Sequence, residues 1–278
     1  MALTVNTNVA SLTAQRNLSS TQGALNTSLQ RLSSGLRVNS AKDDAAGMFS
    51  IERMTADIRG LNQAVRNAQD GISLAQTGEG SMGQIQSALQ RIREISVQSA
   101  NATVEDRTGL QAEVDQLTQE ISRIVTTTEF NGSKLLDGTT ASLTFQIGAD
   151  GDVSNQIDVT GVDLTGLTGY AADLTATGTI DVTSAGSASG AIATIDTAID
   201  EVSTERATFG AVQNRFEAVV VNLTSYAENL SSARGRLQDA DFAAETANLT
   251  RAQILQQAGV AMLAQANTLP QSALALLQ

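Results

Sequence analysis

The chain has no cysteine, no histidine and no tryptophan among its 278 residues, and it has one proline. Without cysteine it forms neither disulfides nor thiolate zinc sites, and it has no thiol nucleophile. Without histidine it lacks the commonest general base and the commonest metal ligand of proteins. These absences exclude most familiar kinds of hydrolase and metalloenzyme.

Basic and aromatic residues are scarce as well. The chain carries 17 Lys and Arg against 29 Asp and Glu, a net charge of −12. This acidic balance argues against nucleic acid as a partner, because phosphate binding relies on clustered Lys and Arg. Hydrophobic residues make up 41% of the chain but aromatic residues only 3%. The core must therefore be aliphatic and rich in alanine, which is typical of helix bundles and coiled coils.

Apolar residues in the first half recur at alternating steps of three and four, the spacing of a coiled-coil seam. Residues 51–75 follow this pattern and 82–92 resume it, so a long helix is expected there. Glycines at and around the junction of the two runs are expected to loosen this helix: Gly71, Gly78, Gly80 and Gly83. A second helix is expected over 110–124, and the polar connection 101–109 favours antiparallel packing of the two.

The same spacing returns after Gly190 and predicts one helix from Ala191 to Leu237. Its seam includes Phe209, Phe216 and Tyr226. At about 1.5 Å per residue the helix would be roughly 70 Å long. A compact globule of this chain length would measure about 50 Å across. The sequence therefore predicts a rod.

The middle of the chain, from Asp137 to Ala191, has no Lys or Arg and is rich in Gly, Thr, Ser and Asp. Apolar and polar residues alternate over 143–147 and again over 157–159, with the turn signal Asp150-Gly151-Asp152 between them. This pattern predicts a β-hairpin with one buried face. We interpret the aspartates as turn residues, because Asn155 and Gly161 stand where a calcium loop needs Gly and Glu.

Both ends of the chain are free of charge. Residues 1–15 and 252–278 contain no charged side chain. Six Gln and Asn residues interrupt the second stretch, which makes a membrane span too costly. The first stretch lacks the basic start and continuous apolar run of a signal peptide. Both ends are therefore expected to form neutral helices that pack closely inside an assembly.

Several sequence motifs toward both ends of the chain are similar to motifs of a known protein family. One is Arg31-Leu32-Ser33-Ser34-Gly35-Leu36-Arg37, followed by Asn39-Ser40-Ala41-Lys42-Asp43-Asp44-Ala45-Ala46-Gly47. Others are the opening run 6–18, the run 90–101, Glu129-Phe130-Asn131-Gly132, and the closing run 249–277. In these motifs the sequence resembles bacterial flagellin, and only the acidic middle lacks a family pattern.

The resemblance implies a mainly α fold: an elongated rod of long coiled-coil-like helices from both chain ends, with a β-hairpin and a minimal variable outer segment. Residues 1–43 and 238–278 would form a terminal-helix domain in the filament core. Residues 44–168 and 190–237 would form a helical rod domain, and 169–189 a short variable surface segment. The filament-core packing would fall on Leu18, Leu25, Leu29, Leu32, Leu36, Leu255, Ala258, Ala261 and Met262.

The resemblance also implies a function without catalysis, cofactor or metal. The chain would be a secreted structural subunit that assembles with itself into the flagellar filament used for motility. Implied partners are the type III export apparatus, a cytoplasmic chaperone on the carboxy-terminal segment, and the filament cap and hook-junction proteins. A vertebrate Toll-like receptor would recognise the helix around Arg91, with Glu113 and Ile95 as further contacts. The family usually has leucine at the position of Ile95.

Two other functions remain open at this point. A secreted hydrolase that uses only carboxylates is disfavoured, because the sequence places no two Asp or Glu residues in a recognisable cleft. A Ser-Lys dyad at Lys42 or Lys134 is disfavoured too, because both lysines sit beside helix or hairpin boundaries with no sign of the burial that activates a catalytic lysine. A secreted coiled-coil adhesin could share the rod. It would not need charge-free ends.

Overall fold

The computed structural model describes residues 7–167, 169–170 and 180–275, with side chains up to residue 268. Its contacts divide the chain into two compact units. Unit 1 consists of residues 1–56 and 229–278, and unit 2 of residues 57–228. Both boundaries fall inside long helices, α2 and α4, whereas the resemblance implies domain limits at residues 43 and 238. Those limits stay a prediction.

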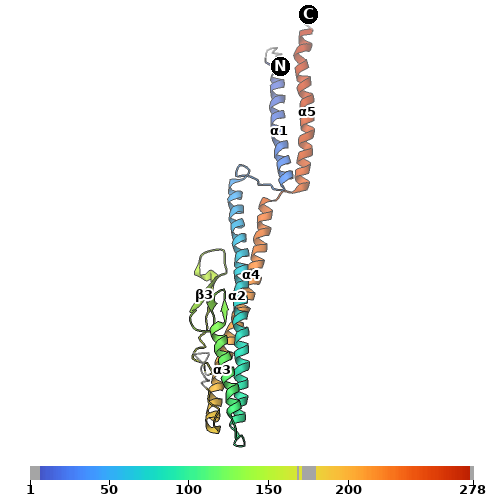
Figure 1. The fold of residues 1–278 in the computed structure, drawn as a ribbon. Helices are drawn as coiled ribbons and strands as arrows, with labels where there is room; N and C mark the ends of the chain where they lie inside the picture. The colour runs from blue at the N-terminus through green and yellow to red at the C-terminus, as the bar shows by residue number, and fades with distance from the viewer. Residues whose placement is uncertain (1–6, 168, 171–179, 276–278) are drawn as a thin grey trace. The chain divides into compact units, whose positions relative to one another are not determined.

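The described chain is mainly helical, as expected (Figure 1). Helices α2 and α4 are very long, with 55 and 54 residues. The helices expected over 110–124 and 191–237 are confirmed as α3 and α4, although α4 already begins at Ala185. The five helices are α1 (Val9–Ser34), α2 (Ala45–Ser99), α3 (Thr108–Thr127), α4 (Ala185–Gln238) and α5 (Phe242–Ala275).

Helix α2 continues without a break through its glycines, so the expectation that they loosen it is wrong. Two of them make room for aromatic rings of α4. A Cβ atom on Gly71 would lie 2.6 Å from Cζ of Phe216, and one on Gly78 would lie 2.8 Å from Cε1 of Phe209. Glycine lowers helix propensity. Here the packed rings offset that cost and hold α2 close to α4.

The predicted β-hairpin is confirmed in unit 2. Strands β3 (Ser142–Gln146) and β4 (Gln156–Thr160) are antiparallel, and a short 3-10 turn, η1 (Val153–Asn155), precedes β4. Leu143 pairs with Val159, and Phe145 pairs with Ile157. The rings of Phe145 and Phe216 meet edge to face, with their centroids 5.5 Å apart. The apolar face of the hairpin therefore packs onto α4.

A second, shorter hairpin was not expected. Strands β1 (Glu129–Phe130) and β2 (Ser133–Lys134) are joined by Asn131 and Gly132, which have φ angles of 47° and 80°. Two successive positive φ angles define the turn that Asn-Gly favours in two-residue hairpins. The Asn131-Gly132 dipeptide was therefore sufficient by itself to predict this hairpin. Lys134 Nζ lies 3.0 Å from Glu129 Oε2 across the pair.

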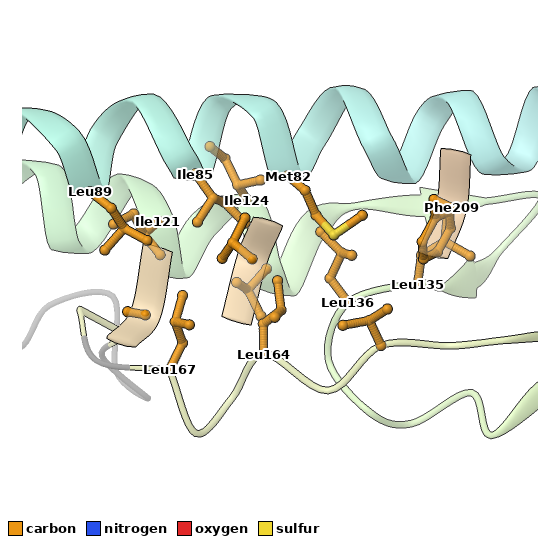
Figure 2. Packing of buried hydrophobic residues seen from close by; sticks show 14 of the residues in the cluster. Met82, Ile85, Leu89, Ile121, Ile124, Leu135, Leu136, Leu164, Leu167 and Phe209 are labelled. Atoms are coloured by element: carbon orange, nitrogen blue, oxygen red, sulfur yellow. The ribbon is translucent and has the colours of Figure 1, made fainter. Parts of the chain in front are cut away.

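Unit 2 has one continuous hydrophobic core (Figure 2). Each of its three helices, the β3–β4 hairpin and the adjoining loops contribute to it. Burying one aliphatic side chain of this size is worth about 1.5–3 kcal/mol. Along α4 the cluster ends at Val220, so Tyr226, which was expected in the seam, is 51% exposed. Figure 2 labels Met82, Ile85, Leu89, Ile121, Ile124, Leu135, Leu136, Leu164, Leu167 and Phe209.

Part of the segment expected at the surface, 169–189, lies in this core instead. Ile180 and Val182 are both buried. The Gln111 side chain donates to Ile180 O over 2.9 Å and accepts from the Val182 N–H over 2.7 Å. Ser99 Oγ donates to Val182 O over 2.6 Å. These bonds fix the returning chain between α2 and α3, and residues 185–189 already belong to α4. Residues 171–179 lie outside the described part.

Candidate functional site

Helices α1 and α5 form an antiparallel pair within unit 1 (Figure 1). Polar side chains cross the pair at both ends and in the middle. Ser11 Oγ donates to Asn267 Oδ1 over 2.9 Å, and Gln256 Nε2 donates to Gln22 Oε1 over 2.7 Å. At the base of the pair the Ala240 N–H donates to Gly35 O over 2.9 Å.

Each helix of the pair has a defined start. The Asn8 side chain caps α1 by accepting from the Ser11 N–H, and it donates to Ala266 O over 2.8 Å. Asp241 Oδ1 accepts from the Ala243 N–H at the start of α5. Side-chain caps of this kind satisfy donors that the first helical turn leaves free. The Asn8 side chain therefore starts α1 and also joins it to α5.

The pair leaves many apolar side chains exposed. A groove of about 570 Å³ lies between the helices, with Val9 and Leu18 on one wall and Leu255 and Met262 on the other. Contiguous apolar surface on a soluble chain marks a site of interaction with another macromolecule. The large hydrophobic residues that are exposed on the two helices are Val9, Leu12, Leu29, Phe242, Ile254, Leu255, Val260 and Met262.

The residues predicted for filament-core packing fall into two groups. The first group lies on the side of α1 that is covered: Leu25 is buried, and Leu18 and Leu32 are half-buried. Leu36 is half-buried but lies beyond the end of α1, which is Ser34, so it does not belong to the seam of that helix. The exposed group consists of Leu29, Leu255, Ala258, Ala261 and Met262.

The sequence analysis did not predict the residues of α1 and α5 that are buried where the two helices pack together. They are small or polar, and all are buried: Ser11, Ser28, Glu245, Ala252 and Ala266. Large apolar residues defined the predicted seams, whereas the residues that face the leucines of α1 are small. The seven-residue spacing of Ala252, Gly259 and Ala266 was the available signal.

One charged pair joins the two helices. Arg31 Nη1 lies 3.9 Å from Glu245 Oε2, and Glu245 is 8% exposed. Arg31 Nε is buried and finds no hydrogen-bond acceptor in the described part of the chain. A buried carboxylate needs a cation or donors beside it. In unit 1 the cation beside the Glu245 carboxylate is Arg31.

In unit 2 the structure brings together two of the three predicted receptor contacts. Arg91 Nε of α2 lies 2.8 Å from Glu113 Oε1 of α3, and Arg91 Nη1 lies 3.0 Å from Glu94 Oε2. The bond to Glu113, and then the bond to Glu94, hold the pKa of Arg91 above its usual value. All three side chains are substantially exposed, so they form a surface cluster.

The third predicted contact, Ile95, does not belong to this surface cluster, and its role in receptor binding stays a prediction. Ile95 has no exposed surface and belongs to the core of unit 2. It follows Arg91 by four residues, but the face of α2 that holds Ile85, Leu89 and Ile92 turns inward here. A partner would reach Ile95 only after α2 and α3 separated.

A groove of about 660 Å³ runs beside this cluster between α2 and α3, with Ser87, Arg91 and Arg123 in its lining. Arg123 Nη2 lies 2.5 Å from Glu120 Oε1. On another side of α2, Arg93 Nε lies 2.5 Å from Asp196 Oδ1 of α4. Surface ion pairs of this kind contribute little stability, about 0–1 kcal/mol each.

Aspartates of the described acidic loops form hydrogen-bonded turns. Within the residues described, no three His, Cys, Asp or Glu side chains lie close enough together to hold a metal ion. Asp163 Oδ1 instead accepts from the Thr165 hydroxyl and N–H, which keeps the pKa of Asp163 below its usual value. Asp181 and Thr183 repeat the arrangement, with the same effect on the pKa of Asp181.

No helix in the described part of the chain combines the length and the apolar character that crossing a membrane requires.

Comparison with known proteins places both ends of the chain in one family. The family "Bacterial flagellin N-terminal helical region" matches residues 5–141, and "Bacterial flagellin C-terminal helical region" matches residues 192–277. A flagellin of Halalkalibacterium halodurans is 45% identical over 277 residues, which cover 99% of each chain. Flagellin D of Vibrio anguillarum is 37% identical over an alignment that covers all of both chains.

Solved structures agree with this. The crystal structure of Bacillus cereus flagellin is 34% identical and covers 61% of this chain and 94% of its own, with a TM-score of 0.50. A putative flagellar hook-associated protein of Vibrio parahaemolyticus covers 71% of this chain with a TM-score of 0.59, and at 13% identity it shows a shared fold alone. Two matching terminal regions and a relative of equal extent lead to one conclusion: this chain belongs to the bacterial flagellin family.

Proposed function

We propose that the chain is a structural subunit, without catalytic activity, that is secreted and assembles with copies of itself into the flagellar filament used for motility. The observation that carries this proposal is the α1–α5 pair, which is helical from end to end and still leaves eight large hydrophobic side chains exposed. The described residues of unit 1 do not cover them. Neighbouring copies would cover them, and every copy would present the same surface to the next.

The charge of unit 1 supports copies of the chain as the partner. Unit 1 carries eight Lys and Arg against six Asp and Glu, and residues 252–278 carry none. Like subunits can therefore approach along α5 without burying unpaired charge, which would cost several kcal/mol. A repeated heterologous contact between like subunits forms an open helical polymer when its rotation does not close into a ring.

Seeded growth of purified chain tests the proposal directly. The monomer is mixed with short filament seeds, and the products are followed by light scattering and electron microscopy. Long uniform filaments support the structural role. Dispersed particles that bind a surface or a cell would instead support the adhesin, and dispersed particles that bind nothing would leave both assignments wrong.

Export through the flagellar type III apparatus and binding of a cytoplasmic chaperone to the carboxy-terminal segment belong to the same proposal, as do contacts with the filament cap and hook-junction proteins. A chain without cysteine can pass unfolded into an oxidising exterior without mispairing. Deletion of residues 252–278 should abolish co-purification with the chaperone while unit 2 keeps its helical signal. Retained co-purification would place the chaperone site elsewhere.

Recognition by a vertebrate Toll-like receptor is the second part of the proposal. Arg91 and Glu113, which the resemblance implies as contacts, lie 2.8 Å apart on an exposed surface of unit 2. Arg91→Ala should weaken binding of the monomer by a hot-spot amount, about 1–3 kcal/mol. Arg123→Ala, which removes another exposed arginine from the same groove, is the matched control. Equal signalling by Arg91→Ala and the parent chain would remove this part of the proposal.

A further inference from the structure

Helices α1 and α5 meet along a seam that repeats every seven residues. In α1 the seam contains Ser11, Leu18, Leu25 and Leu32, and in α5 it contains Glu245, Ala252, Gly259 and Ala266. Leucines of one helix thus face small residues of the other. A Cβ atom on Gly259 would lie 3.4 Å from Leu18 Cδ1 and 4.0 Å from Leu18 Cβ, which places these two residues opposite each other.

A seam of this kind does not define its own register. If α5 slides by seven residues along α1, Leu18 faces Ala252 or Ala266 instead of Gly259, so a leucine again meets a small residue. Leu25 and Leu32 keep small partners, Gly259 and Ala252, when α5 slides in one direction, and they face Glu245 and Gln238 when it slides in the other. The apolar contacts therefore distinguish poorly between the observed pairing and its seven-residue alternatives.

The polar residues of the seam do distinguish between them. Glu245 is the first of the four seam residues of α5, and the other three are Ala252, Gly259 and Ala266. It is buried beside Arg31. Slippage in one direction brings Glu245 opposite Leu25 and away from Arg31, and slippage in the other carries it past the end of α1. A buried carboxylate that loses its cation is strongly unfavourable. Ser11 likewise loses Asn267 in either direction.

We propose that the Arg31–Glu245 pair, with Ser11 and Asn267 at the other end, selects the register of the α1–α5 pair. This rests on the proposed function and deepens it. A helical polymer needs every subunit to present the same surface, and a subunit slipped by one repeat would move Leu255 and Met262 away from the groove that they share with α1. A single polar position that fixes register at some cost in stability is well attested in coiled coils.

The absence of cysteine makes the register directly measurable, because two introduced cysteines are then the only ones in the chain. Leu18→Cys with Gly259→Cys reports the observed register, since a Cβ separation of 4.0 Å lies within the range of a disulfide. Leu18→Cys with Ala266→Cys, and Leu18→Cys with Ala252→Cys, report slippage by seven residues in either direction. Each pair is oxidised mildly in the full chain, and the cross-linked peptides are quantified by mass spectrometry.

The register residues are then removed by Arg31→Met with Glu245→Ala, which continues the small-residue pattern of α5 without a break. We expect the slipped cross-links to rise by at least about tenfold over the parent. We expect the thermal melt to be unchanged or raised, because replacing a buried ion pair by apolar residues is often neutral or stabilising. Arg16→Met with Glu52→Ala removes one cation and one carboxylate at exposed positions outside the seam and should leave the cross-links as in the parent.

The inference is overturned if the Arg31→Met, Glu245→Ala chain cross-links only in the observed register. The main-chain bonds between residues 35–37 and 238–240 would then set the register alone. The inference is also overturned if the control chain with Arg16→Met and Glu52→Ala gives as many slipped cross-links as the chain with Arg31→Met and Glu245→Ala. Failure of the proposed function has a different signature, because the parent chain would then not grow from seeds although its cross-links report the observed register.

Discussion

The two units of this chain are built from similar helices but hide their apolar residues to very different degrees. Of thirteen large hydrophobic side chains that are exposed in the described part of the chain, nine belong to unit 1 and four to unit 2. Every described residue with no exposed surface at all, from Ala68 to Phe216, belongs to unit 2. Unit 2 has an extended core of its own, whereas in unit 1 the helices α1 and α5 share a single narrow seam and only a few further residues, such as Val38 and Ile51, are buried.

Charge separates the units in the same way. Unit 1 has eight basic against six acidic residues, a net charge of +2, and unit 2 has nine against 23, a net charge of −14. A strongly charged surface keeps a folded body soluble, and a neutral apolar one favours association. Unit 2 therefore holds most of the buried apolar core, and unit 1 holds most of the exposed apolar surface that neighbouring subunits could cover.

A charge on the exposed face of α5 should have the largest effect. Ala261 is exposed in the single chain, so Ala261→Asp should leave the melt of the monomer unchanged. In the polymer the carboxylate would lie unpaired against neighbouring helices, a cost of several kcal/mol at every subunit. We expect no growth from seeds, measured by light scattering.

Ala193→Asp on an exposed position of α4 is the matched control for Ala261→Asp, and it should still grow. Normal growth of Ala261→Asp would show that residues 252–278 do not pack between subunits. If both substitutions block growth, the filament tolerates no added charge on either unit, and the two units do not differ in their role in assembly.

Proteolysis should separate the units in the monomer and not in the polymer. An isolated pair of helices with a single seam is marginal in water. A non-specific protease should therefore trim both ends of the monomer and leave a fragment close to residues 57–228, as mass spectrometry would show. The same ends should be spared in filaments. Equal protection in both states would mean that unit 1 is stable without neighbours.

Removing a ring from the core should damage unit 2 alone. Phe216 is fully buried, contacts Gly71 and meets Phe145 edge to face. Phe216→Ala should lower the free energy of unfolding by about 3–5 kcal/mol, measured by urea denaturation. Tyr226→Ala on the same helix, half exposed, should change it by no more than about 0.5 kcal/mol. If both substitutions lower the free energy of unfolding by similar amounts, the core does not end at Val220 along α4.

The smallest predicted effect concerns the acidic turns of unit 2. The Thr165 hydroxyl and N–H hold the pKa of Asp163 below its usual value. This turn therefore adds stability above the ordinary carboxyl pKa, and the contribution is lost as the pH falls through the lowered pKa of the folded state. Thr165→Val should raise the pKa of Asp163 toward its usual value in an NMR titration. An unchanged pKa would mean that the hydroxyl contributes nothing.

Most secondary structure followed from the sequence, because it depends on period and turn chemistry within a short window. Steps of three and four predicted α2, α3 and α4, and alternation around Asp150-Gly151-Asp152 predicted the β3–β4 hairpin. The Asn131-Gly132 turn was equally readable and was missed. The neutral ends were visible as well, since the absence of charge is a property of composition alone.

The tertiary structure decided which face of each element has a partner. Arg91 and Ile95 lie one turn apart on α2, yet one is exposed and the other is buried, because α3 and the loops cover only one side of the helix. Leu25 is buried on α1 and Leu29 is exposed, because a single helix, α5, packs against α1. A hydrophobic period specifies that a helix has an apolar face. It does not specify how wide a strip of that face another part of the same chain will cover.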